Sequence, residues 1–174
     1  MLDIETLSTQ PNATILTIGA IKFDLDKPIL PLEDMDIFYE RVSIESCEEL
    51  NMHIDPVTQR WWDKQEDDVR YEALEHPERH PITQVLNRFC KWYGNAKKVY
   101  ANSPNFDCVI MEQAFRSCNI VAPWKFWEMM DVRTILSIGK INLKNISYTR
   151  AHNALHDSYK QIIGVVKAVK NLGL

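Results

Sequence analysis

The segment 14–24 places the strongest constraint on how this chain can fold. It is rich in β-branched and apolar residues, which is typical of a strand. Its first half is apolar on both faces, at Ile15, Leu16, Ile18 and Ala20. A strand of this kind lies inside a sheet that is covered on both sides, and Gly19 in its middle indicates close backbone packing or a bulge. We therefore expect an inner strand of a layered sheet.

Shorter patterns predict the elements around this strand. Further strands are expected at 3–5, 37–42 and 98–101. Short links join the first three strands, which favours an antiparallel meander followed by parallel crossovers. Helices are expected from Asp55-Pro56, over 81–94, from Asp107 to near Cys118, and from Ala154 with Asn153 as N-cap. Together these patterns predict a single α/β domain over residues 1–174, with a mixed five-stranded sheet flanked by helices.

Composition limits the class of protein. With 174 residues, 45% of them hydrophobic and 25% charged, the chain is long enough for one domain with a sizeable core. No apolar stretch approaches the ~20 residues of a membrane span. The four cysteines show no C-x-x-C spacing, so we expect reduced thiols and a cytoplasmic location. A net charge of −4 argues against bulk electrostatic coating of nucleic acid, but not against an enzyme that meets phosphate through bound cations.

Four acidic residues stand in recognisable settings. Asp3 and Glu5 point to the same face of a strand, with Ile4 behind them. Two such carboxylates repel each other unless a cation or a proton lies between them. Asp107 lies at a strand-to-helix junction, where open α/β sheets commonly meet ligands, although an acid there is also a common N-cap. Asp157 falls in the first turn or two of the last helix.

Two histidines shortly precede Asp157. His152 lies on the approach to the helix and can fold back over the acid, whereas His156 is adjacent to Asp157 and points about 100° around the helix axis from it. The segment 132–156 contains no Asp or Glu, but it carries Arg133, Lys140, Lys144 and Arg150. This basic segment is either a phosphate-facing rim or a loop with ordinary surface cations.

Three further features have both a functional and a structural interpretation. Trp61 and Trp62 are either a stacking wall for a base or core residues, and we expect at least one of them in the core. Segment 63–80 carries seven acids, which is typical of a solvated helix face and loop turned away from nucleic acid. His76 and His80 have the spacing of metal ligands on a helix, yet the prolines that follow each of them disfavour a continuous helix.

Taken in order, three motifs resemble those of a known enzyme family. They are D-I-E-T at 3–6, N-S-P-N-F-D at 102–107 and H-N-A-L-H-D at 152–157. These are similar to the motifs of the DnaQ-like, DEDDh-type 3′–5′ exonucleases, whose fold is ribonuclease-H-like. The phrases around them, including P-V-T-Q-R-W-W at 56–62, look closer to the branch with the phage exonuclease DexA and bacterial 3′–5′ exoribonuclease-like proteins. The resemblance spans nearly the whole chain.

The resemblance implies a role for each motif residue. Two divalent cations, Mg²⁺ or Mn²⁺, would be held by Asp3, Glu5, Asp107 and Asp157. Mg²⁺ prefers oxygen ligands, which fits a carboxylate set, and Glu5 would also orient the attacking water. His152 would be the general base, since an imidazole exchanges protons near neutral pH. Contacts with the substrate are implied for Thr6, Leu7, Asn102 and Phe106, with Leu7 as an apolar wedge.

The expected activity is metal-dependent release of nucleoside 5′-monophosphates from the 3′ end of single-stranded DNA or RNA. The choice between them depends on contacts with a 2′-hydroxyl, which no motif encodes. The alternative from another class is a nucleic-acid or nucleotide-binding module without turnover, which a misplaced first strand would produce. Only Met1 and Leu2 precede Asp3, so either that strand is short or residues that precede Met1 in the natural protein are missing. The related bacterial proteins also suggest a homodimer.

Overall fold

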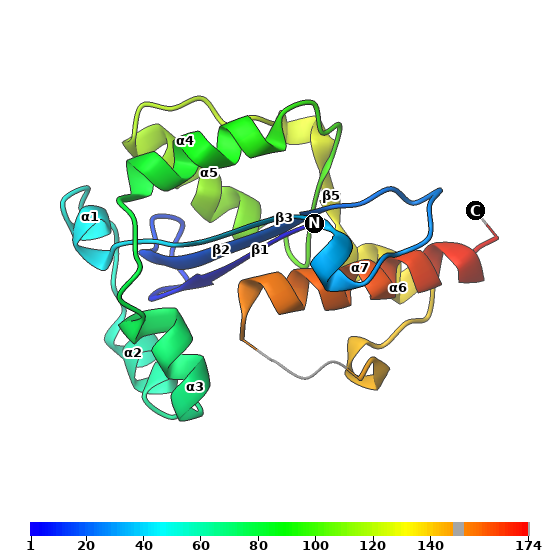
Figure 1. The fold of residues 1–174 in the computed structure, drawn as a ribbon, viewed down its shortest axis with the longest axis horizontal. Coiled ribbons are helices and arrows are strands. Elements are labelled where there is room, and N and C mark those ends of the chain that lie inside the picture. Colours follow the sequence, from blue (N-terminus) through cyan, green and yellow to red (C-terminus); the bar gives the residue numbers. More distant parts are fainter. Residues whose placement is uncertain (148–151, 174) are drawn as a thin grey trace.

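The computed structural model describes residues 1–147 and 152–173, arranged around a five-stranded sheet of order β3-β2-β1-β4-β5 (Figure 1). Its strands are β1 (Leu2–Thr6), β2 (Ile15–Lys22), β3 (Asp36–Arg41), β4 (Val99–Ala101) and β5 (Met129–Asp131). β1, β2 and β3 pair antiparallel, whereas β4 runs parallel to both β1 and β5. The predicted α/β fold with a mixed five-stranded sheet is confirmed, and it is consistent with a ribonuclease-H-like fold.

Helices cover both faces of the sheet. One face carries α4 (Ile82–Tyr93) and α5 (Asp107–Ser117), and the opposite face carries α6 (Val132–Ile138) and α7 (Ala154–Asn171) (Figure 1). Between β3 and α4 the chain forms α1 (Ile44–Glu48), α2 (Pro56–Trp62) and α3 (Asp67–Arg70), followed by a π-helical turn at Tyr71–Glu75. Short 3-10 turns lie at Leu32–Asp34, Phe126–Glu128 and Leu143–Asn145. None of the helices described is long and apolar enough to cross a membrane.

The inner position predicted for segment 14–24 follows from its burial on both faces. Every residue of β2 except Lys22 is buried. Ile18 packs in the core under α4 and α5, whereas Ile21 packs in the core under α6 and α7. Hydrophobic burial on both faces therefore holds β2 between the two helical layers, as the sequence pattern predicted.

Gly19 marks the place where α7 meets the sheet. A Cβ atom at Gly19 would lie 2.3 Å from the backbone nitrogen of Leu155, so no larger residue fits without a shift of the helix. The Ser158 hydroxyl donates a hydrogen bond to the Gly19 carbonyl at 3.1 Å. Gly19 also stands opposite Asp3 in the register of β1 and β2. Of the two interpretations of this glycine, close backbone packing is therefore correct, and it places the first turn of α7 beside Asp3.

Two segments differ from the expectation. Part of the segment 132–156 is not a loop but helix α6, whose N-cap Asp131 accepts a hydrogen bond from the Arg133 N–H at 3.1 Å. The helix is short and buries only Val132 and Leu136 completely, so its sequence shows little helical periodicity. Lys140 and Lys144 are exposed, and Arg150 lies outside the described residues.

The acidic segment 63–80 is not wholly a solvated face. Glu72 is half-buried, and it accepts hydrogen bonds from the Tyr39 hydroxyl at 2.6 Å and from the Arg41 Nε at 2.7 Å. This ion pair with β3 offsets the cost of removing the Glu72 carboxylate from water. The remaining acids of the segment are exposed, which agrees with the prediction.

Candidate active site

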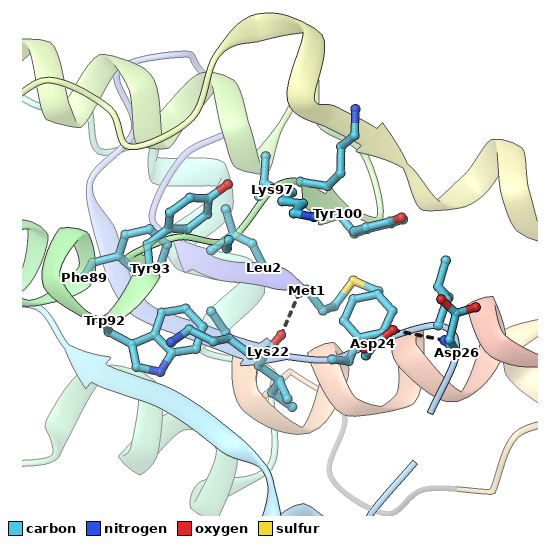
Figure 2. A pocket seen from close by; sticks show the side chains of 17 residues that line it. Met1, Leu2, Lys22, Asp24, Asp26, Phe89, Trp92, Tyr93, Lys97 and Tyr100 are labelled. Atoms are coloured by element: carbon cyan, nitrogen blue, oxygen red, sulfur yellow. Dashed lines mark hydrogen bonds between the residues drawn. The ribbon is translucent and has the colours of Figure 1, made fainter. Parts of the chain in front are cut away.

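Two cavities of about 550 Å³ each differ sharply in their chemistry. The first lies at the amino end of β1 and β4, and Phe89, Trp92, Tyr93, Tyr100 and Lys97 are among its lining residues (Figure 2). It contains none of the four acids of the motifs. The second lies further along the same strands, toward their carboxyl ends, and its lining includes Asp3, Glu5, Asp107, His152 and Asp157. The second cavity is therefore the candidate active site.

Strand β1 supplies the first two acids. Asp3 pairs with Gly19 and Glu5 with Thr17 in the antiparallel register with β2. Both carboxylates line the cavity, while Ile4 between them is buried in the core on the other face of the sheet. The first strand is therefore in place, and the strand displacement that would favour a silent module is not present.

Helix α5 supplies the third acid. Asp107 is the first residue of α5 and is only 4% exposed. Its Oδ1 accepts a hydrogen bond from the backbone N–H of Ile4 at 3.3 Å, so the carboxylate is tied to β1 between the two acids of that strand. The N-cap residue of α5 is Phe106, and no side chain caps the helix. Asp107 is therefore not an ordinary helix cap.

Helix α7 supplies the fourth acid and the histidine that precedes it. Asn153 is the N-cap, as predicted, and its side chain accepts hydrogen bonds from the N–H groups of Leu155 and His156. Asp157 lies in the first turn. His152 has a positive φ of 61°, and its backbone N–H donates to Asp157 Oδ2 at 2.9 Å. The backbone at His152 therefore folds back onto the acid, as the spacing of the motif predicted.

Three of the four acids form a compact set of oxygen donors, and Asp107 lies outside it. One oxygen each from Asp3, Glu5 and Asp157 lies within 4.8 Å of the others. No Lys or Arg side chain among residues 1–147 and 152–173 makes an ion pair with any of the four acids. A cluster of carboxylates without a direct ion pair, and without sulfur or imidazole donors in the set, suits hard divalent cations such as Mg²⁺.

Burial raises the pKa values of these acids, and the charges of neighbouring acids add to the effect at Asp3 and Glu5. Burial raises the pKa of Glu5 to about 8, and the charges of Asp157 and Asp107 add to the effect. Burial also raises the pKa of Asp107 to about 7, although the hydrogen bond from the Ile4 N–H lowers this pKa. The pKa of Asp3 is raised well above its ordinary value by burial and then by the charges of the other three acids. The cluster therefore favours bound protons, or a bound cation, over four free negative charges.

Sequence reasoning missed two polar neighbours of the acids. Gln161, one turn beyond Asp157 on α7, is 3% exposed and donates a hydrogen bond from Nε2 to Asp3 Oδ1 at 2.8 Å. Lys160 lines the cavity, and its charge opposes the rise of the Asp157 pKa. The spacing of four from Asp157 to Gln161 places both on one face of α7, and this spacing could have indicated Gln161.

The residues expected to contact substrate occupy different environments. Asn102 and Phe106 line the cavity. Thr6 and Leu7 follow Glu5 but are buried, with exposed fractions of 7% and 4%. The Thr6 hydroxyl donates to the Ser8 carbonyl at 2.7 Å, and Leu7 packs in a small cluster with Leu16, Trp62 and Ala73.

The two tryptophans differ in burial, and the two histidines His76 and His80 do not share a helix. Trp62 is buried, which confirms that at least one tryptophan belongs to the core, whereas Trp61 is 41% exposed. His76 follows the π-helical turn and His80 bridges to Val42 at the end of β3, so no continuous helix joins them. His80 lies 3.7 Å from a carboxylate oxygen of Glu40.

Comparison with known proteins places the chain in a family. Residues 1–169 match the family model of the 3′-5′ exoribonuclease Rv2179c-like domain. Neither the curated proteins nor the solved structures that were compared contain a match. The matched region includes all four acids and His152, and a 3′-5′ exonuclease family implies nucleic acid as substrate. The chain therefore belongs to the Rv2179c-like family of 3′-5′ exoribonuclease domains.

Proposed function

We propose that this protein is a metal-dependent 3′–5′ exoribonuclease of the DEDDh type, in the branch that includes DexA. One observation carries the proposal: Asp3, Glu5, Asp107 and Asp157, from three separate elements, converge in one cavity with His152 at its edge. The family match supports the reaction and RNA as the substrate. The products are nucleoside 5′-monophosphates.

Each residue of the site has a defined task in this proposal. Two divalent cations, Mg²⁺ or Mn²⁺, would be held by Asp3, Glu5, Asp107 and Asp157, and would supply the positive charge that phosphodiester hydrolysis needs. Glu5 also orients the attacking water. His152 accepts the proton of that water as general base. Gln161 holds the Asp3 carboxylate in one orientation through its hydrogen bond.

Residues at the edge of the cavity bind the RNA chain. Asn102 and Phe106, which line the cavity, contact the terminal nucleotide. Thr6 and Leu7 are buried and do not line the cavity, so the structure offers no surface for the contacts that the resemblance implies for them. Arg133 lines the cavity from α6 and provides a cation for a substrate phosphate. Of the two interpretations of the basic segment 132–156, the phosphate-facing one is therefore proposed for Arg133.

The direction of degradation tests the reaction. Single-stranded RNA labelled at its 5′ end should give a ladder that shortens by one nucleotide at a time in Mg²⁺ or Mn²⁺, and a blocked 3′ end should resist. The DNA strand of the same sequence is the matched comparison for the choice of sugar. Cleavage of a circular RNA would show an endonuclease and would contradict the proposal. Binding without any cleavage would identify the silent binding module instead.

The raised pKa values predict how stability depends on pH when metal is removed. The pKa of Glu5 is about 8 and that of Asp107 about 7 in the folded protein, above their values in the unfolded chain. Their neutral forms therefore stabilise the folded state below the unfolded pKa values, and this contribution is lost as pH rises toward 8. In excess EDTA we expect Tm to fall by several degrees between pH 5 and pH 8.

A metal titration completes this experiment. Mg²⁺ or Mn²⁺ should raise Tm more at pH 8 than at pH 5, because binding to the folded state alone stabilises it and the ligands must be ionised. In Glu5→Gln the decline of Tm with pH should be smaller, since one titrating carboxyl is gone. A Tm that rises from pH 5 to pH 8 in EDTA would contradict the pKa assignment.

The assembly state remains a separate prediction. The resemblance to bacterial exoribonuclease-like proteins suggests a homodimer, and light scattering at micromolar concentration should then give twice the mass of the 20.3 kDa chain. A monomer mass under these conditions would refute the dimer.

A further inference from the structure

An exposed tryptophan touches the proposed general base. Trp61 is the sixth of the seven residues of α2, and its ring lies against the imidazole of His152. The ring centroids are 4.9 Å apart and the planes are nearly perpendicular, at 89°. This is the edge-to-face geometry that aromatic rings favour. The two residues are far apart in sequence, so the fold itself creates this contact.

Trp61 is rigidly attached to the end of β1 through its neighbour. Trp62 is buried, and its Nε1 donates a hydrogen bond to the carbonyl of Thr6 at 2.9 Å, one residue after Glu5. The rings of Trp61 and Trp62 are also edge to face, with centroids 5.0 Å apart. Asp55 caps the start of α2, and its backbone N–H donates to the Leu7 carbonyl at 2.8 Å. The position of Trp61 is therefore fixed relative to β1.

His152 is held less firmly than Trp61. Its side chain is exposed, and its backbone adopts a left-handed conformation that non-glycine residues rarely adopt. The backbone N–H is tied to Asp157, but no hydrogen bond to the imidazole ring occurs among the residues that the structure describes. Among the described residues, contact with Trp61 is thus a feature that limits where the ring can point.

We infer that Trp61 is a positioning residue that keeps the imidazole of His152 directed over the acid cluster. The inference rests on the proposed function, since it assigns Trp61 to the placement of a general base. Strand β1, which carries Asp3 and Glu5, holds Trp62 through the Thr6 carbonyl, and Trp61 next to it contacts His152. The position of the proposed base is therefore linked to the strand that carries two of the acids. The other interpretation of an exposed tryptophan beside His152 is a stacking surface for an RNA base. The two interpretations differ in their kinetic effect.

The kinetic test compares Trp61→Ala, Trp61→Phe and Trp127→Ala at saturating metal. Trp127 is a matched control, because it is a tryptophan that is 57% exposed and whose ring pairs with Phe126 rather than with His152. For Trp61→Ala we expect kcat to fall roughly 2- to 10-fold, the ratio that corresponds to the energy of one edge-to-face pair, with KM nearly unchanged. Trp61→Phe should retain most of the wild-type kcat because it keeps a ring at this position, and the kcat of Trp127→Ala should match that of the wild type.

A double mutant separates positioning from a general structural effect. In the His152→Ala background, Trp61→Ala should cause little further loss, since the residue that it positions is gone. A kcat loss that is as large in this background as in the wild type would overturn the inference. A rise in KM at unchanged kcat would also overturn it and would identify Trp61 as a stacking residue.

The NMR chemical shift of the His152 imidazole tests the contact with Trp61 without a measurement of turnover. In the free protein the Trp61 ring current should displace the Hε1 resonance of His152, assigned through His152→Ala. Trp61→Ala should move this resonance toward its position in an unstructured peptide, and Trp127→Ala should leave it in place. An unmoved resonance in Trp61→Ala would overturn the inference. If the wild type lacks exonuclease activity, the proposed function fails, and the resonance still decides whether Trp61 holds His152.

Discussion

Replacing Asp107 with alanine or asparagine is expected to reduce turnover by about 10² to 10⁴-fold while the fold remains intact. A cation at such a site supplies several kcal/mol of charge stabilisation to the transition state, and each 1.36 kcal/mol corresponds to about tenfold in rate. The asparagine variant is the sharper test. It can still accept the hydrogen bond from Ile4, so it removes the negative charge without removing the link to β1. The measurement is kcat with 5′-labelled RNA.

The same loss is expected for Asp3→Ala, Glu5→Ala and Asp157→Ala, since these oxygens form one donor set. Asp63→Asn is the matched control, because Asp63 is an exposed acid outside the cavity and should leave kcat unchanged. Circular dichroism should give the same spectrum for all variants. Near-normal turnover of Asp107→Asn, or full activity of the wild type in excess EDTA, would refute the assignment of a metal site.

The sequence was informative where one residue type answers one physical requirement. β2 could be predicted because only an inner strand needs apolar residues on both faces. At Gly19 the sequence left close packing and a bulge as alternatives, and only the fold shows that α7 is the element that packs there. Asn153 and Asp55 could be predicted as helix caps, since each side chain satisfies a backbone N–H at a helix start. The meander followed from the short connections between the first three strands.

The remaining features depend on contacts between distant segments. β5 is three half-buried residues that gain strand geometry by pairing with β4, so its own pattern is weak. Gln161 meets Asp3 only because Gly19 lets α7 approach β1. The contact of Trp61 with His152 likewise requires α2 to be docked by Trp62. Local periodicity carries no information about such contacts, so they became visible only in the folded chain.

His152→Ala is expected to lose roughly 10²-fold or more in turnover, and His156→Ala much less. Both histidines shortly precede the same acid, Asp157, so the two alanine variants are matched. His152 lines the cavity and its backbone N–H is bonded to Asp157, which places the residue at the edge of the acid cluster. His156 belongs to the first turn of α7 and does not line the cavity. Geometry therefore favours His152 over His156 for the proposed role of general base, which is also the residue that the motif spacing implies.

The increase of Tm on metal addition, measured in two variants, distinguishes a lost base from a lost metal site. The increase of Tm on addition of Mg²⁺ or Mn²⁺ should be the same in His152→Ala as in the wild type, because all four carboxylates remain. In Asp157→Ala the same increase should be much smaller, because one of the metal ligands is gone. His152→Ala should therefore bind cations normally and fail at proton transfer. A larger loss of turnover in His156→Ala than in His152→Ala, at saturating metal, would show that His156 is the base.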